Sequence, residues 1–318
     1  MIAPAGLPSQ AGVARSWLRL SRHWKWARTD GIGRLVEEDG LDLRDRLSTA
    51  ARKRRWRQKH GVDSGTAVAV FLVGVQRSGT NMIVRGLEAA PEFEVHNEND
   101  RRVFDRFQLR SLADARDVVA RSRHRFVLFK PLCDSHRTAE LLDQVGISHP
   151  ARALWAYRAV DGRAASAVAK FGDVNLRVMR GIAEGRGSAW WQSQCLSEEA
   201  LDFVRSFDYD TMTPLSAAAL FWYIRNNLVF DLGLDRRPDV TLVSYEALVA
   251  APEPRMREIC DFLGFDWEPS LISHIEHRSS SNRRLDIDPR IRVRCDTLQS
   301  RLDAARSGGL ATSGACSI

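Results

Sequence analysis

The stretch AVAVFLVGVQRSGTNMIVRGLEAA, residues 67–90, determines most of what this sequence says about its fold. Residues 67–74 form a continuous apolar run that ends in glycine, a pattern typical of a strand buried on both faces. A loop bracketed by Gly74 and Gly79 follows, and apolar residues then recur at helical spacing. A strand, a glycine-bracketed loop and a helix predict a phosphate cradle, because backbone N–H groups and the positive end of the helix converge on one anion.

Further buried strands and helices alternate along the rest of the chain. The expected strands are residues 91–95, 126–129, 153–157 and 240–245, and the expected helices are residues 80–90, 138–145, 217–232 and 254–263. This alternation implies a parallel sheet that helices cover on both faces. The predicted fold class is therefore α/β, a single three-layer domain with a central parallel sheet and a phosphate-binding loop, similar to P-loop NTPases. We expect a basic helical extension and linker at 1–65, the α/β domain at 66–306 and a flexible tail at 307–318.

The positive charge of this chain lies at its N-terminus. The chain has 318 residues, 44% hydrophobic and 27% charged, which are the proportions of an ordinary globular protein. Of its 47 Lys/Arg and 40 Asp/Glu, residues 1–60 hold 14 basic and 6 acidic side chains, and the remainder holds 33 and 34. The predicted α/β domain therefore lacks the basic surface that nucleic-acid binding needs, and we expect no nucleic acid partner.

The extension contains Trp17, Leu20 and Trp24 at helical spacing among arginines, and a basic helical run ends at residues 51–61. Such an arm is compatible with peripheral contact to an anionic membrane or with packing on its own domain. No apolar run approaches the ~18–20 residues of a membrane span. The five dispersed cysteines favour a reducing compartment, and we expect a cytoplasmic protein. These cysteines are Cys133, Cys195, Cys260, Cys295 and Cys316.

The loop departs from nucleotide-hydrolysing loops at the residues that contact phosphate and Mg²⁺. Those loops continue Gly-Lys-[Ser/Thr], whereas Thr80 replaces the lysine here and Asn81 replaces the hydroxyl residue. The missing lysine argues against ATP or GTP, and Arg77 supplies a positive charge within the loop. A small-molecule kinase on the same fold stays an alternative, as does a non-catalytic protein that docks on a membrane or a partner through the arm.

The loop resembles the 5′-phosphosulfate-binding loop of sulfotransferases, which use 3′-phosphoadenosine 5′-phosphosulfate (PAPS). The residues that carry this resemblance are Gln76, Arg77, Ser78, Gly79, Thr80 and Asn81. In that family a strand ends in Arg, and a Ser eight residues later shares the 3′-phosphate; Arg158 and Ser166 match this pattern. A third match, the segment 243–264 with Tyr245-Glu246 and Phe262-Leu-Gly, is expected to brace the domain. The resemblance spans roughly residues 68–305, and it implies PAPS as co-substrate.

Two further nucleotide contacts are implied by position. Tyr223 lies in an aromatic segment, 221–223, that resembles a nucleotide-contacting helix of relatives, with core packing as the alternative. Arg283 belongs to the basic, serine-rich stretch 279–284, which resembles the loop that closes over the 3′-phosphate, with a solvated loop as the alternative.

Sulfuryl transfer to a hydroxyl or amine requires a cation at the leaving phosphate and a base for the acceptor's proton. Arg77 and Lys130, which ends the strand at 126–129, are the expected cations. Glu98 is the expected base, because it follows the strand at 91–95 on the sheet edge where α/β proteins bind ligands.

In the tyrosylprotein sulfotransferase branch, a segment at similar spacing from the loop holds a Glu that acts as the base. The segment from the loop to Glu98 therefore resembles that branch most. His96 and Asp100 are the alternative bases.

No metal is expected. His274-Ile-Glu-His277 has the spacing of two metal ligands, but a third ligand at suitable spacing is missing, and solvated helix residues are the favoured interpretation. The expected acceptor is a small molecule, a glycan or a lipid. We expect residues 172–213 to form part of its site, with His136 and Arg137 in the pocket.

Overall fold

The computed structural model describes residues 43–275 and 283–313. The chain divides into two compact units, residues 1–55 and 56–318. Of the first unit, only part of helix α3 (Leu43–His60) is described, and this helix confirms the one predicted to end near residue 61. The amphipathic helix predicted around Trp17, Leu20 and Trp24 lies outside the described residues, and the predicted domain boundaries stay predictions. No helix in the described ranges has the length and apolarity that crossing a bilayer requires.

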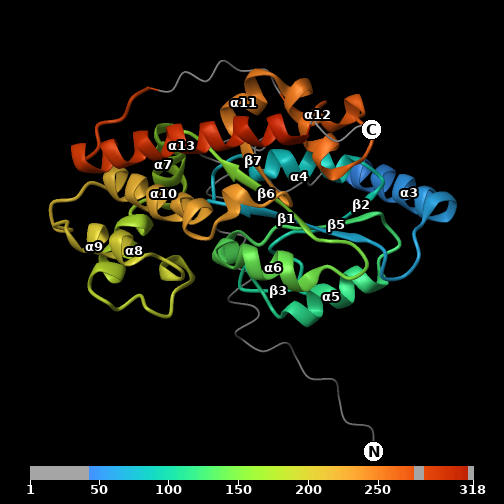
Figure 1. The fold of residues 1–318 in the computed structure, drawn as a ribbon, viewed down its shortest axis with the longest axis horizontal. Coiled ribbons are helices and arrows are strands. Elements are labelled where there is room, and N and C mark those ends of the chain that lie inside the picture. The colour runs from blue at the N-terminus through green and yellow to red at the C-terminus, as the bar shows by residue number, and fades with distance from the viewer. Residues whose placement is uncertain (1–42, 276–282, 314–318) are drawn as a thin grey trace, which may run out of the picture. The chain divides into compact units, whose positions relative to one another are not determined.

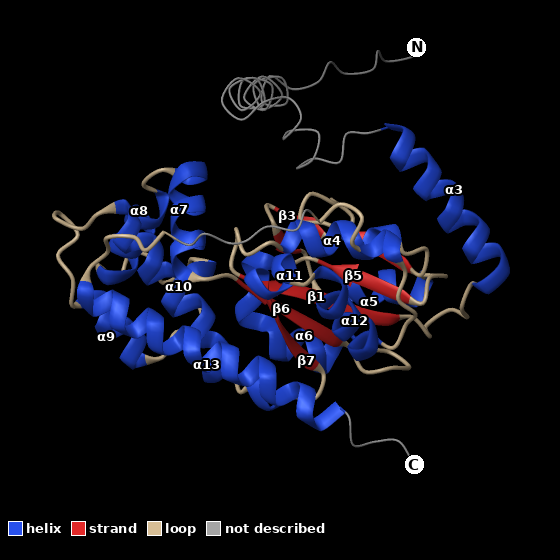
Figure 2. Ribbon diagram, turned by 90° about the horizontal axis from the view of Figure 1, so that it is seen from above, coloured by secondary structure: helices blue, strands red, loops and turns tan. Residues whose placement is uncertain are grey.

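A five-stranded parallel sheet forms the centre of the second unit (Figures 1 and 2). In spatial order its strands are β2 (Phe93–His96), β5 (Phe126–Phe129), β1 (Val68–Gly74), β6 (Arg152–Tyr157) and β7 (Val240–Ser244). Each neighbouring pair is parallel, so all five carboxyl ends lie along one edge. The predicted α/β class, parallel sheet and strand positions are confirmed.

Helices account for most of the remaining chain of this unit. They are α4 (Thr80–Ala89), α5 (Leu112–Arg121), α6 (Thr138–Val145), α7 (Val160–Phe171), α8 (Val174–Ala183), α9 (Glu198–Arg205), α10 (Pro214–Asp231), α11 (Tyr245–Ala250), α12 (Pro252–Leu263) and α13 (Pro289–Ser313). Helices α4, α6, α10 and α12 match predicted helices, whereas α5, α8, α9 and α13 have no counterpart among the predictions. Helix α13 includes the start of the segment predicted as a tail.

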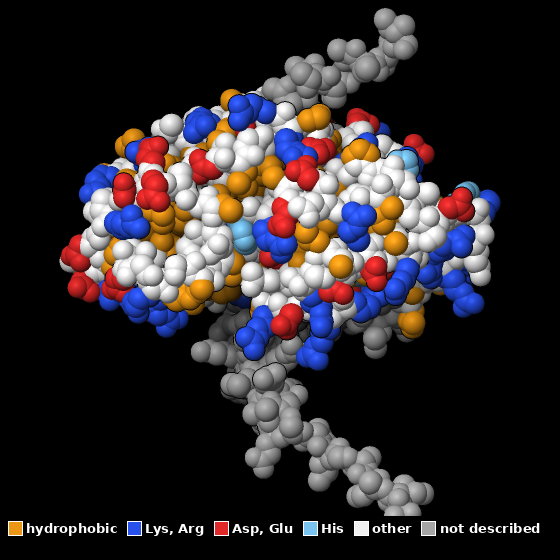
Figure 3. All heavy atoms as spheres, turned by 60° about the horizontal axis from the view of Figure 1, so that its bottom comes forward, with side chains coloured by type: hydrophobic (Ala, Val, Ile, Leu, Met, Phe, Trp, Pro, Cys, Tyr) orange, Lys and Arg blue, Asp and Glu red, His pale blue; other side chains and the backbone are white. Residues whose placement is uncertain are grey.

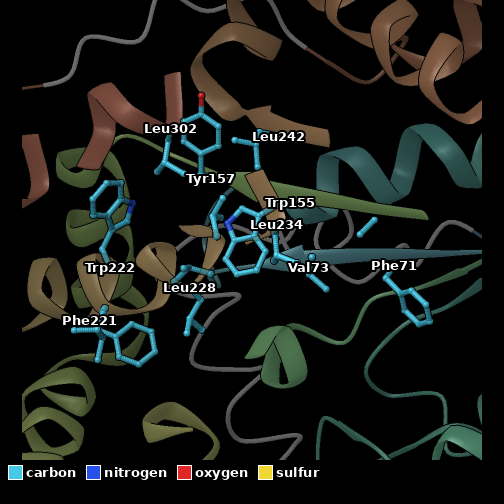
Figure 4. Close-up of a cluster of buried hydrophobic side chains, with 14 of the residues drawn as sticks. Phe71, Val73, Trp155, Tyr157, Phe221, Trp222, Leu228, Leu234, Leu242 and Leu302 are labelled. Atoms are coloured by element: carbon cyan, nitrogen blue, oxygen red, sulfur yellow. The ribbon is translucent and has the colours of Figure 1, made fainter. Parts of the chain in front are cut away.

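Alternate side chains of the sheet pack into two hydrophobic layers, as the pleat of a strand requires. Phe71 of β1 and Trp155 of β6 face a layer that contains side chains of α5, α6, α10 and α13. Figure 4 shows this layer, with Tyr157 of β6 beside Leu302 of α13. Leu72 of β1 faces the opposite layer, which contains side chains of α4, α11 and α12. The three-layer arrangement therefore follows from strands that are apolar on both faces.

The carboxyl edge of the sheet brings together segments that are far apart in sequence. Strand β1 leads into the loop at 75–79, β2 leads to Glu98, β5 to Lys130, β6 to Arg158 and β7 to Tyr245. The candidate site is therefore the group of side chains that these strand ends bring to one edge of the sheet.

On the face shown in Figure 3, acidic and basic side chains are interspersed, so the charge of this surface does not by itself mark a binding site.

Candidate active site

The loop between β1 and α4 has the backbone of an anion cradle. Gly74, Arg77 and Gly79 have positive φ angles of 122°, 73° and 82°. A β-carbon at Gly74 would lie 2.2 Å from the carbonyl oxygen of Ala156 in β6, and one at Gly79 would lie 2.5 Å from the ring of Tyr245. Both positions therefore require glycine. Gly79 caps α4 without a side-chain hydrogen bond, so no cap side chain satisfies the N–H groups of the first helical turn.

Side chains of the loop include a hydroxyl group that lacks a partner. Ser78 is 1% exposed, and its hydroxyl oxygen has no hydrogen-bond partner among the described residues. Arg77 donates from Nε to the Ser166 hydroxyl of α7 at 3.0 Å. Ser166 thus contacts the loop, and the described contacts include no hydrogen bond between Ser166 and Arg158. A buried hydroxyl without a partner beside an arginine is a feature of a site that accepts an anion.

Lys130 lies next to two other predicted site residues, Asn81 and Glu98. Its Nζ donates to Asn81 Oδ1, in the first turn of α4, at 2.7 Å and lies 3.7 Å from Glu98 Oε2. Burial raises the pKa of Glu98 above its usual 4.5, although the charge of Lys130 opposes this rise. Burial also lowers the pKa of Lys130, against the attraction of Glu98. A carboxylate with a raised pKa beside an ammonium group has the properties of a general base next to a cation.

The two alternative bases are engaged with other groups. His96 is fully buried, with Nδ1 2.8 Å from Asp100 Oδ2 and Nε2 3.2 Å from Glu94 Oε1. Asp100 also accepts a hydrogen bond from Arg102 Nη2 at 2.6 Å. Burial raises the pKa of Asp100, but hydrogen bonds from Arg102 and His96 outweigh burial and hold this pKa well below its usual value. These contacts favour Glu98 over His96 and Asp100.

Arg158 lies against the segment that follows β7. Its guanidinium carbon is 4.4 Å from the ring centroid of Tyr245, and its Nε is 3.9 Å from Glu246 Oε1. Neither of these two atoms, Arg158 Nε and Glu246 Oε1, has a hydrogen-bond partner in the described part of the chain. Glu246 Oε2 accepts from the backbone N–H of Ala159 at 3.0 Å, a contact that agrees with the bracing role expected for Glu246.

Tyr223 and Arg283 have different surroundings. The Tyr223 ring packs edge-on against Phe203 of α9, with 5.7 Å between ring centroids. Arg283 is exposed, and residues 276–282, which include most of its predicted loop, lie outside the described residues. Nucleotide contact by Tyr223 and by Arg283 stays a prediction.

The interpretation of His274 as a solvated helix residue is wrong. The residue lies in a turn, and its Nε2 is 2.9 Å from the carbonyl oxygen of Met82 in α4. Burial lowers the pKa of His274. His277 is outside the described ranges. Within those ranges, no group of three or more His, Cys, Asp or Glu side chains is arranged to hold a metal ion.

Sequence patterns did not identify the residues that support the loop. The 3₁₀ helix η1 (Leu132–Arg137) follows Lys130, and the hydroxyl of its Ser135 accepts from the N–H of Gly74 at 3.0 Å and donates to the Gly74 carbonyl at 2.9 Å. Arg163 of α7, 1% exposed, donates from Nε to the Gln76 carbonyl at 3.2 Å, and burial lowers its pKa to about 9. Their position in the sequence could have identified these residues. Ser135 lies in η1, which follows a buried strand directly, and Arg163 lies one helical turn before Ser166.

Comparison with known proteins gives one family. Residues 68–285 match the family described as "Sulfotransferase domain". No curated protein matches the chain. Among solved structures, a sulfotransferase from Alicyclobacillus acidocaldarius has 17% identity, coverage of 75% of this chain and 94% of that chain, and a TM-score of 0.40.

Two further solved structures are sulfotransferase domains of larger systems, and their identity to this chain is also below 20%. The domain from the curacin biosynthetic pathway has 14% identity, coverage of 76% of this chain and 99% of that chain, and a TM-score of 0.45. The domain from the Synechococcus PCC 7002 olefin synthase has 16% identity, coverage of 81% and 98%, and a TM-score of 0.37.

Proposed function

This chain belongs to the sulfotransferase domain family, and from that membership we propose that it transfers a sulfuryl group from PAPS to an acceptor hydroxyl or amine. The observation that carries the proposal is the cluster of Lys130, Asn81 and Glu98 at the carboxyl edge of the sheet. It places an ammonium group between the first turn of α4 and a carboxylate with a raised pKa, which are the groups that such a transfer needs.

Each group has a separate role in this proposal. PAPS supplies a sulfuryl group on a phosphate leaving group. Glu98 takes the proton of the acceptor at its carboxylate. Lys130, 8% exposed, and Arg77 present positive charge where negative charge accumulates on the leaving phosphate, and a poorly solvated cation acts more strongly there than in water. Asn81 orients the Lys130 ammonium group through their 2.7 Å hydrogen bond.

The residues around the loop fit a ligand that carries two phosphate groups. One set of donors lies at the loop, where Ser78 has an unpartnered hydroxyl and Gly79 leaves the start of α4 without a side-chain cap. A second donor, Arg158, lies at the end of β6 and has an unpartnered Nε. Two separate donor groups support recognition of the 5′-phosphosulfate and the 3′-phosphate, which ATP and GTP lack.

Calorimetric titration with 3′-phosphoadenosine 5′-phosphate, without magnesium and beside ADP and ATP, tests the proposal. Micromolar or tighter binding of the bisphosphate, with weaker binding of ADP and ATP, is the expected result. Preference for ATP with Mg²⁺ would favour the kinase alternative, and binding of no nucleotide would contradict the proposed donor.

Arg158→Ala is expected to weaken binding of the bisphosphate by about 10- to 100-fold, the usual worth of a hydrogen bond to a charged group. Turnover at saturating donor is expected to change much less, because Arg158 is not part of the Lys130–Glu98 cluster. Arg257→Ala is the matched control, since Arg257 of α12 also covers an aromatic ring, with its guanidinium carbon 4.0 Å from the Trp267 centroid. Equal loss of bisphosphate affinity in Arg158→Ala and Arg257→Ala would show that removal of any guanidinium stacked on an aromatic ring weakens binding. Arg158 would then have no specific contact with the phosphate.

The N-terminal arm is proposed to contact anionic membrane surfaces, and a cytoplasmic location is proposed for the protein. Basic residues of α3, among them Arg54 and Arg55, are exposed. Deletion of residues 1–55 is expected to leave bisphosphate binding and turnover intact and to reduce sedimentation with phosphatidylserine vesicles. Loss of turnover with intact folding would instead assign the arm a part in the reaction.

A further inference from the structure

An open cavity of about 550 Å³ lies between three neighbouring segments of the chain. Its walls are the β3–β4 hairpin (Phe104–Asp105 and Gln108–Leu109), the start of α5 and η1. This volume is typical of small-molecule sites. We call it the hairpin cavity. Residues that line it include Asp105, Gln108, Arg110, Asp134, His136 and Arg137.

Helix η1 connects this cavity to Glu98. The backbone of Leu132, the first residue of η1, is one of the groups that lower the pKa of Glu98. Two residues later, Asp134 lines the cavity and accepts at Oδ2 from the backbone N–H of Leu109 at 2.8 Å, which ties the hairpin to η1. The negative charge of Asp134 acts on Glu98 and adds to its raised pKa. The proposed base and one wall of the cavity are therefore held by the same six-residue element.

The hairpin turn has an unusual conformation for its residues. Arg106 and Phe107 have φ angles of 49° and 72°, and a two-residue turn with two positive φ values is the type I′ arrangement that Asn-Gly normally supplies. A bulky residue rarely adopts it. The Phe107 side chain is 58% exposed, so core packing does not compensate for the strain. Strained residues of this kind cluster at ligand sites, which points to a binding role for the exposed ring.

The cavity walls are polar and carry charges of both signs. Three carboxylates (Asp105, Asp114 and Asp134) face two guanidinium groups (Arg110 and Arg137), and Leu109 is the apolar member of the lining.

The remaining polar groups are uncharged. Burial and the charge of Arg225 lower the pKa of His136 to about 4, so its imidazole is uncharged at neutral pH. The Gln108 side chain lowers the pKa of the Asp134 carboxyl group. Such a surface offers both donors and acceptors to hydroxyl groups, whereas an apolar ligand would leave these groups unpaired at a large cost.

We propose that the hairpin cavity binds the acceptor, and that the acceptor is an uncharged polyhydroxylated small molecule of the carbohydrate type. This inference rests on the proposed function. Hydroxyl groups of the acceptor pair with Gln108 and Arg137, which line the cavity, and the apolar C–H face of a sugar ring lies on the ring of Phe107, which belongs to the hairpin turn between the lining residues Asp105 and Gln108. The acceptor oxygen bonds to sulfur, the bond from sulfur to the bridging oxygen of the donor breaks with its electrons going to the phosphate, and the hydroxyl proton goes to Glu98.

Release of 3′-phosphoadenosine 5′-phosphate from PAPS, measured with the full chain, tests the acceptor class. The panel compares neutral mono- and disaccharides with 2-naphthol and 1-octanol. At least one saccharide is expected to accelerate release about tenfold or more above both apolar acceptors. Acceleration by the apolar acceptors alone, or by no saccharide, overturns the inference. The bisphosphate titration is made in parallel: its failure would refute the proposed donor, whereas tight binding with inert saccharides would refute only the acceptor class.

Phe107→Gly separates a binding role from a structural one. Glycine adopts positive φ freely, so the melting temperature is expected to stay unchanged or to rise. With the best saccharide, kcat/KM is expected to fall by about 2- to 10-fold, the range of one aromatic contact. Phe171→Ala is the control, because Phe171 is 40% exposed and belongs to α7, a helix that contributes no residue to the cavity lining. Unchanged kcat/KM in Phe107→Gly would show that the ring contacts no acceptor.

Gln108→Leu tests the polar wall with little risk to folding, since this side chain is exposed. It is expected to raise the KM for the saccharide about tenfold, the worth of one lost hydrogen bond and one unpaired group, with unchanged bisphosphate affinity. Gln144→Leu, an exposed position on α6 outside the cavity, is the matched control. Equal KM values in the two variants would overturn the placement of the acceptor in the hairpin cavity.

Discussion

Glu98→Gln is expected to lower kcat by about 10²- to 10⁴-fold, the usual contribution of a positioned general base. The amide keeps the size of the side chain and its hydrogen-bonding reach, but it does not take up a proton from the acceptor. Binding of the bisphosphate is expected to stay unchanged or to tighten slightly, because loss of the carboxylate leaves the charge of Lys130, 3.7 Å away, without its counter-charge. Single-turnover rates and calorimetric titration measure the two effects separately.

Glu92→Gln is the control for that variant. Glu92 is also a partly buried carboxyl group whose pKa burial raises, but it precedes β2 and so lies at the opposite end of the strand that leads to Glu98. Turnover in Glu92→Gln is expected to be close to that of the unmodified protein. Similar turnover in Glu98→Gln and Glu92→Gln would refute Glu98 as the base, and parallel loss of binding and turnover in Glu98→Gln would indicate a structural role.

Lys130→Met is expected to lower kcat by about 10²- to 10³-fold, the loss that follows removal of one preorganised electrostatic group. Methionine fills the volume of the lysine stem but leaves both Asn81 and Glu98 without the ammonium group that holds them. Lys59→Met, at an exposed position of α3, is the control. A decrease in bisphosphate affinity alone, with normal kcat, would place Lys130 in ground-state binding.

The same variant changes the pH dependence in a direction that can be derived. A general base works only when it is deprotonated, so kcat/KM falls as the pH drops through the pKa of Glu98. Burial puts this pKa above 4.5, and Lys130 lowers it. In Lys130→Met the pKa therefore rises further, and the acid limb of the profile moves to higher pH. Profiles from about pH 4 to about pH 9 measure the shift; a limb that moves to lower pH would show that another group titrates.

Much of the fold could be predicted because its signals are local. A strand buried on both faces is a run of apolar residues, and residues 68–74 and 126–129 have no other simple interpretation. Helix α13 was missed because charged residues recur from Arg290 to Arg306, and it packs through Ile291, Leu298 and Leu302 onto α10. Its hydrophobic positions become informative only once the neighbouring helix is known.

Partner choice within the site could not be predicted in the same way. Ser166 is expected to share a phosphate with Arg158, and that role stays a prediction; the contact that the sequence did not indicate is the hydrogen bond to its hydroxyl from Arg77, 89 residues away in sequence. His96 stayed an alternative to Glu98 on sequence alone, and only the structure shows His96 between Glu94 and Asp100. Hydrogen bonds depend on separations of about 3 Å, and strand ends fix segments to within a few residues but not to that precision.

The sequence by itself determined the α/β class, the phosphate loop and the order of the segments that resemble sulfotransferases, because each is written in consecutive residues. Only the tertiary structure decided that Lys130 reaches Asn81, 49 residues away, and that η1 holds both Gly74 and Glu98. The physical reason is the strand order β2-β5-β1-β6-β7, which places β5 between β2 and β1. A parallel sheet brings distant strand ends to one edge, and which ends become neighbours depends on packing of the whole chain.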